Sequence, residues 1–156
     1  MLKLITKTIA AVAVVSVALL GSVNAKTLKI ETHFTANSPN GEVAAQFAKN
    51  VEMFSGGSLK VEMFYSSSVT GKSAEVFNSA QTGIIDCDMT GAGYQTGKNA
   101  AFQFAGDVMG GYDNPYQQYE FLNFPGAQEA VDALYNKYGM TLIGWWIPGH
   151  ESLISS

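Results

Sequence analysis

The chain has 156 residues, of which 47% are hydrophobic and 14% are charged, and its formal net charge is −4. This length fits one domain of about 100–200 residues, and the apolar content excludes an intrinsically disordered chain. All nine basic residues are lysines. The lack of arginine and the negative net charge argue against nucleic acid as a partner, because that binding needs a basic surface.

Residues 1–25 have the pattern of a secretory signal peptide. Lys3 and Lys7 precede an apolar run at residues 9–20, and small residues follow at 23–25, where a signal peptidase would cleave. The alternative is a transmembrane anchor, but the run is shorter than the roughly 20 apolar residues that span a bilayer. We therefore predict export from the cytoplasm and cleavage after Ala25.

The next 65 or so residues alternate between strand and helix patterns. Residues 27–34 predict a strand with Lys29, Glu31 and His33 on its polar face. Ser38-Pro39 caps a helix that ends at Gly56-Gly57, and a strand at 59–65, a helix at 73–82 and a strand at 84–90 follow. This order predicts an α/β fold with a mainly parallel sheet flanked by helices.

The remaining residues are less regular. Residues 91–112 are rich in Gly, Phe and Tyr, and helices are expected from Asn114-Pro115 and over residues 126–138. Residues 140–147 are almost wholly apolar, which predicts a strand buried on both faces. Residues 150–156 resemble a further strand that simply stops, so we expect the chain to be a fragment of a longer protein.

Catalytic and cofactor motifs are weak. The segment Gly91–Lys98 follows a predicted strand, but it lacks glycines that the dinucleotide and phosphate-binding loops require. Asp86 and Asp88 could form an acid/base pair, although a solvated strand face is the simpler interpretation, and Cys87 between them is expected to be a buried structural cysteine. His33 and His150 belong to no metal-spaced motif, so no metal or cofactor is predicted.

Three features fit ligand binding instead. The loop after the first strand, with His33, Phe34 and Thr35, leads into a helix N-terminus, where backbone N–H groups favour an anion. Tyr94 and Gln95 follow the third strand and are expected at the same edge of the sheet. Trp145-Trp146 and Glu151 lie where the chain is expected to leave this domain. Each feature also has a structural alternative: an ordinary turn for the first, core packing for the second and solvent exposure for the third.

The ordered series of these features resembles the DctP-type substrate-binding proteins of tripartite ATP-independent periplasmic (TRAP) transporters. The similar pieces are the signal peptide, the strand Thr27–Ile30, the segments Phe47–Glu62 and Gln81–Asp86, and the segments Tyr135–Trp146 and Gly149–Leu153. The resemblance implies a two-lobed periplasmic receptor for a small organic acid, with a keto or hydroxy acid favoured by residues 96–112. The receptor would deliver this acid to membrane permease subunits driven by an ion gradient. A secreted hydrolase or dehydrogenase with a degenerate glycine loop is the alternative.

The resemblance also assigns the parts of this chain. Residues 26–147 would form the first lobe, and residues 148–156 the crossover strand into a second lobe. In the family, an arginine of the second lobe chiefly holds the ligand carboxylate, and this chain has no arginine. We therefore expect this chain alone to bind ligand weakly or not at all. Glu151 falls where the keto-acid branch usually has an amide, and a carboxylate there would repel an anion unless it serves a cation or a ligand hydroxyl.

Overall fold

The computed structural model describes residues 25–106, 108 and 110–147. The predicted signal peptide, apart from Ala25, and the predicted crossover strand with Glu151 lie outside these residues. Among the described helices, none is both long and apolar enough to cross a membrane.

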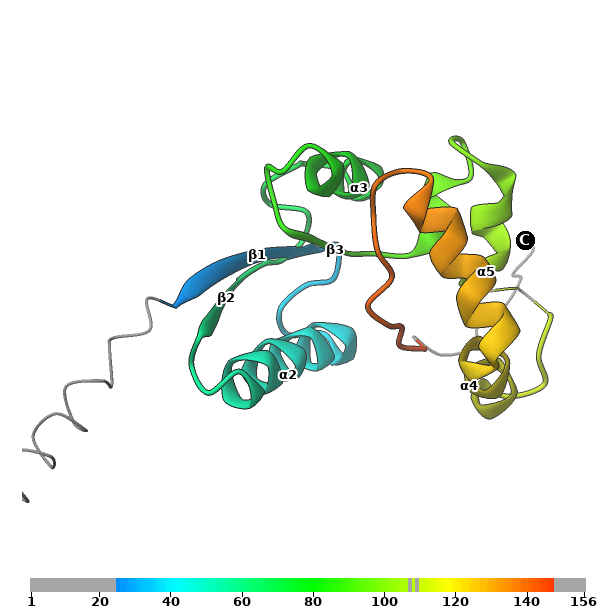
Figure 1. Cartoon of the computed structure of the whole chain (residues 1–156), viewed down its shortest axis with the longest axis horizontal. Helices are drawn as coiled ribbons and strands as arrows, with labels where there is room; N and C mark the ends of the chain where they lie inside the picture. The colour runs from blue at the N-terminus through cyan, green and yellow to red at the C-terminus, as the bar shows by residue number, and fades with distance from the viewer. Residues whose placement is uncertain (1–24, 107, 109, 148–156) are drawn as a thin grey trace, which may run out of the picture.

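A three-stranded parallel sheet forms the centre of the fold. Its strands are β1 (Lys26–Thr32), β2 (Leu59–Phe64) and β3 (Cys87–Met89), in the spatial order β2-β1-β3. Helices α2 (Pro39–Phe54) and α3 (Ser73–Gln81) lie on opposite sides of this sheet (Figure 1). The predicted α/β class with parallel pairing is therefore confirmed.

The third strand is shorter than predicted. Only Cys87–Met89 pairs with β1, whereas the strand was expected over residues 84–90. The backbone N–H groups of Ile84 and Ile85 instead donate to the carbonyl of Ser79 at 2.9 and 3.3 Å. These bonds satisfy a carbonyl at the end of α3, so the residues that close the helix are not available to the sheet.

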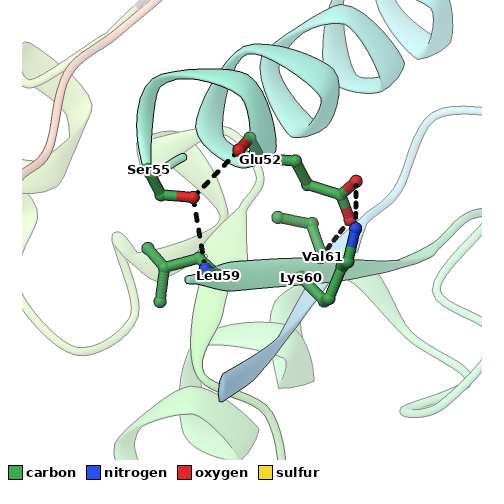
Figure 2. Close-up of polar contacts among 5 residues, drawn as sticks. All are labelled: Glu52, Ser55, Leu59, Lys60 and Val61. Atoms are coloured by element: carbon green, nitrogen blue, oxygen red, sulfur yellow. Dashed lines mark hydrogen bonds and ion pairs between the residues drawn. The ribbon is translucent and has the colours of Figure 1, made fainter. Parts of the chain in front are cut away.

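Side-chain hydrogen bonds join the end of α2 to the start of β2 (Figure 2). Glu52 Oε1 accepts from the backbone N–H of Val61 at 2.9 Å, and its Oε2 lies 3.4 Å from Lys60 Nζ. Ser55 Oγ donates to the Glu52 carbonyl at 3.0 Å and accepts from the Leu59 N–H at 3.2 Å. The helix-to-strand turn is thus held by two side chains of its own helix end.

Glu52→Ala is expected to lower the melting temperature at pH 7, because the Val61 N–H loses its acceptor. The backbone bond from Val61 is the main reason that the pKa of Glu52 lies below its ordinary value. This contribution to stability is present at neutral pH and disappears as the carboxylate is protonated in acid. Thermal unfolding of E52A beside E62A, which changes an exposed glutamate of β2, measures it. Equal melting temperatures for the two variants at pH 7 would contradict this role.

The second half of the chain packs beyond the carboxyl ends of the strands (Figure 1). It contains the 3₁₀ helices η1 (Ala92–Gln95) and η2 (Ala100–Phe104) and the helices α4 (Pro115–Asn123) and α5 (Pro125–Asn136). Asn114 Oδ1 caps α4 as expected, since it accepts from the N–H groups of Tyr116 and Gln117 at 3.0 and 3.1 Å. The main buried cluster joins α3, the two 3₁₀ helices and α5, and its members are Phe77, Ala92, Phe102, Ala105, Val131 and Leu134.

Residues 140–147 do not form the predicted strand. The segment runs without sheet pairing between the strand ends and α5. Leu142 donates its N–H to Asp132 Oδ1 at 3.0 Å, and Ile143 is 72% exposed, so one face of the segment is open. A buried strand needs a neighbouring strand for its backbone groups, and the described part of the sheet places none beside this segment.

Candidate functional site

The loop between β1 and α2 is a rigid turn at the carboxyl edge of the sheet. Ser38 caps the helix: its Oγ accepts from the Gly41 N–H at 3.1 Å and donates to the Thr35 carbonyl at 2.8 Å. The loop after β2 is bonded to the same segment, because the Ser66 N–H donates to the Phe34 carbonyl at 2.9 Å. The residues that follow β1 are therefore held from two sides.

Gly41 allows this loop to lie directly against the first turn of α2. A Cβ atom at position 41 would collide with the Thr35 carbonyl oxygen and lie 2.8 Å from that of Ala36. Backbone atoms on both sides leave such a Cβ little room to relax. The close approach explains why a buried glycine stands in the first turn of a helix.

Gly41→Ala is expected to destabilise the protein by about 1–3 kcal/mol, the usual cost of overpacking, and to displace residues 33–38. Gly93→Ala is the matched control, because a Cβ at position 93 has open space around it. Urea denaturation measures the stability of the two variants. A G41A variant as stable as G93A would show that the loop does not need this close approach.

Four aromatic side chains from three segments meet at this edge of the sheet. We call them the aromatic cluster: His33, Phe34, Tyr94 and Trp146. The ring centroid of His33 lies 3.9 Å from that of Phe34 and 5.3 Å from that of Tyr94. The Phe34 ring lies 5.9 Å from that of Trp146. The fold therefore brings together three of the six predicted site residues, and adds one of the two tryptophans.

The aromatic cluster is only partly covered. Tyr94 is 47% exposed, and His33, Phe34 and Trp146 are half-buried. Burial lowers the pKa of His33 below its ordinary value, so the imidazole is neutral at pH 7. Its Nδ1 is buried and has no hydrogen-bond partner. Such a surface offers apolar walls and a neutral polar group, a combination typical of small-molecule sites.

The other predicted site residues are placed differently. Gln95 is 3% exposed, and its Nε2 donates to the carbonyl of Ala74 in α3 at 3.2 Å, which ties η1 to that helix. Thr35 is exposed and uses its carbonyl oxygen to accept from Ser38. Glu151 lies outside the described residues. Ligand contacts by these three residues remain predictions.

The polar face of β1 and β3 is solvated at Lys29 and Asp86 but covered at Glu31, where solvent exposure was expected. Asp86 is exposed, and its Oδ2 accepts from the Lys29 N–H at 2.8 Å, but Glu31 is fully buried. Burial raises the pKa of Asp88 to about 6. The neighbouring Thr90 acts against this rise, and the charge of Glu31 adds a smaller amount to it. Alternation alone could not reveal this, because loop residues Val69 and Thr70 cover Glu31.

The remaining sequence motifs carry no chemistry in this structure. Within the described residues, no three His, Cys, Asp or Glu side chains gather as metal ligands. The glycine-rich segment after β3 forms η1, and not the start of an α-helix, as a phosphate-binding loop would. Cys87 is half-buried, and burial followed by the charges of Asp86 and Asp88 raises the pKa of its thiol, which disfavours the reactive thiolate.

Solved structures with the same fold are periplasmic solute-binding proteins of TRAP transporters. One from Rhodobacter sphaeroides, in an open state without ligand, is 27% identical, with a TM-score of 0.73, over 79% of this chain and 39% of its own. One from Pseudoalteromonas atlantica with bound sodium and pyruvate is 20% identical, with a TM-score of 0.67, over 74% of this chain and 35% of its own. One from Sulfurospirillum deleyianum with bound succinate is 22% identical, with a TM-score of 0.59, over 72% of this chain and 36% of its own.

This chain thus spans about two fifths or less of the length of these relatives. A search of curated proteins found no match. The family model that matches residues 30–156 describes solute-binding receptors, which are not enzymes. The chain therefore belongs to the bacterial extracellular solute-binding proteins of family 7, the DctP family.

Proposed function

We propose that residues 26–147 form the first lobe of a periplasmic receptor that captures a small organic acid for a TRAP transporter. The observation that carries this proposal is the family match over residues 30–156. The relatives with bound pyruvate and succinate support the ligand class, because both ligands are small carboxylates. Membrane permease subunits of such a transporter are the proposed protein partners, and export by residues 1–25 would bring the receptor to the periplasm.

The aromatic cluster is the proposed ligand surface of this lobe. It lies past the carboxyl ends of β1 and β3, which is where open α/β sheets bind ligands. Tyr94 and Trp146 would supply apolar walls for the carbon chain of the acid. The His33 imidazole, which burial keeps neutral, would add no charge to the site.

The ligand carboxylate would find little charge to hold it in this lobe. The chain has no arginine, and only arginine presents the planar pair of donors that binds a carboxylate through two parallel bonds. Losing such an anchor costs about 2–5 kcal/mol. We therefore expect this chain by itself to bind acids with dissociation constants near the millimolar range, which corresponds to about −4 kcal/mol.

Weak binding of this kind is measured by NMR titration of the ¹⁵N-labelled chain with pyruvate, succinate and other acids of two to six carbons. We expect saturable shift changes at residues 33–38 and 91–95 with at least one acid. Tyr94→Ala should weaken that binding at least tenfold, while Tyr116→Ala, which changes an exposed tyrosine of α4, should leave it unchanged. The absence of saturable changes at these residues with every acid would contradict the proposed function.

A secreted enzyme is the less supported alternative. The matching family consists of receptors, and a receptor needs affinity and a change of shape, not a catalytic pair. Of the acidic residues first considered for catalysis, Asp86 uses its carboxylate to accept a backbone N–H of β1. We therefore propose a non-catalytic role for this lobe.

A further inference from the structure

Two acidic residues, one fully buried and one largely covered, occupy paired positions on neighbouring strands. Glu31 of β1 and Asp88 of β3 are partners in the parallel register. Residues paired in this way project from the same face of the sheet, on strands about 4.8 Å apart. Glu31 has no exposed surface, and Asp88 is largely buried. This arrangement brings two acidic groups together away from water.

One oxygen of each carboxylate is buried without a hydrogen-bond partner. Glu31 Oε1 accepts from the backbone N–H groups of Val69 and Thr70 at 2.7 and 3.3 Å, but its Oε2 is buried and unpartnered. Asp88 Oδ1 is also buried and unpartnered. A buried acceptor without a donor is costly, and a pair of them that both carry charge is more so.

No ion pair within the described residues offsets this cost, because the one found there joins Lys60 to Glu52. From α3, the titratable Glu75 is exposed and bonds to Asn78. From α5, Tyr135 remains protonated, because burial and the charge of Asp88 raise its pKa to about 12.

The titratable neighbours on the strands themselves are also uncharged or distant from the pair. His33, two residues beyond Glu31, is neutral at pH 7 because burial lowers its pKa. Cys87, next to Asp88 in β3, keeps its thiol proton. Asp86 is exposed and engaged by the Lys29 N–H. The charge of the pair must therefore be reduced within the pair.

We propose that Glu31 and Asp88 share one proton in mildly acidic solution, with the Asp88 carboxyl O–H donating to Glu31 Oε2. The proton comes from solvent, no covalent bond between heavy atoms changes, and the charge of the pair falls from −2 to −1. One charge-assisted hydrogen bond then satisfies the orphaned oxygen of Glu31. Glu31 is the acceptor in this bond, as its Oε1 already is toward two backbone N–H groups.

The site is independent of the proposed receptor function, and its test needs no organic acid. Aspartate side chains are labelled with ¹³C at the carboxyl carbon, and the Asp88 signal is followed from pH 4 to pH 9. We expect a protonated signal that persists above pH 5, where an ordinary aspartate has lost its proton, and that is missing in Asp88→Asn. Asp86→Asn is the matched control and should leave this signal unchanged.

Glu31→Gln tests whether the proton is shared. Removing the neighbouring negative charge should lower the Asp88 midpoint, which a structural role for Glu31 alone would not do. An Asp88 midpoint near 4 in the wild type, or one that does not move in E31Q, would overturn the proposal. The wild-type titration decides the question by itself where E31Q does not fold. A midpoint that falls with added sodium chloride but not with choline chloride would also overturn it, because a metal cation would then be the occupant.

Discussion

Phe77→Ala is expected to lower the free energy of unfolding by about 3–5 kcal/mol, the range for removing a fully buried phenylalanine. Phe77 has no exposed surface and belongs to the main buried cluster. Its ring centroid lies 5.8 Å from that of Phe102, 6.0 Å from that of Tyr135 and 5.8 Å from that of Tyr138. A cavity at this position would remove contacts with all three rings at once.

The position of Phe77 in the fold makes the expected loss of stability larger than the loss of buried apolar area alone would give. It lies on α3, which covers the sheet, whereas its partners lie on η2 and in and after α5. The ring therefore connects the sheet half of the fold to the helical half. Since domains are stable by only about 5–15 kcal/mol, the loss could unfold the chain at modest urea concentrations.

Urea denaturation followed by circular dichroism measures this effect. Phe104→Ala is the matched control, because Phe104 is nearby in η2 but 63% exposed, and its loss should cost less than about 1 kcal/mol. Comparable losses for the two variants would show that Phe77 does not hold the two halves together.

The sequence predicted the sheet half of the fold better than the helical half. Residues 26–89 carry clear signals: Ser38-Pro39 begins α2, glycines follow α2 and α3, and short loops imply parallel strands. These signals are local, so a single sequence is enough to read them. After β3 the chain forms two short 3₁₀ helices, Ala92–Gln95 and Ala100–Phe104, and contacts with distant segments place Phe102.

The prediction of a strand at residues 140–147 was wrong for the same reason, because the outcome depends on contacts with distant segments. An apolar run predicts burial, and Met140, Leu142 and Trp145 do pack against the main buried cluster. Whether such a run becomes a strand depends on a neighbouring strand, which no pattern within the run specifies. The two adjacent tryptophans are placed differently, since Trp145 packs against the cluster and Trp146 contacts Phe34.

The sequence could predict only those residues of the candidate site that lie just after the carboxyl end of a strand. His33, Phe34 and Tyr94 were expected at one edge of the sheet, because parallel strands end together, and they do meet there. The buried pair of Glu31 and Asp88 was not predicted, since the polar face of an alternating strand ordinarily faces water. Its burial depends on the loop at residues 69–70 and on α5, which lie 38 residues or more from Glu31 in the sequence.

Asp88→Asn is expected to stabilise the protein at pH 8 by up to about 3 kcal/mol and to leave its stability at pH 4 nearly unchanged. The pKa of Asp88 rises from 3.8 to about 6 on folding, chiefly because burial disfavours the charged form. When the pKa of a group differs by one between the folded and unfolded states, the free energy of unfolding changes by about 1.4 kcal/mol. An asparagine resembles the neutral carboxyl at every pH, so the variant avoids the cost of a buried charge.

The direction of this dependence follows from the protons bound in each state. Between pH 3.8 and about 6 the unfolded chain releases the Asp88 proton while the folded protein keeps it, so the free energy of unfolding falls as the pH rises. Above pH 6 both states have lost it, and the full cost remains. The difference in stability between D88N and wild type, measured by urea denaturation at pH 4, 5, 6, 7 and 8, should therefore grow through this window and then level off. A constant difference for D88N across the whole range would mean that folding does not raise the pKa of Asp88.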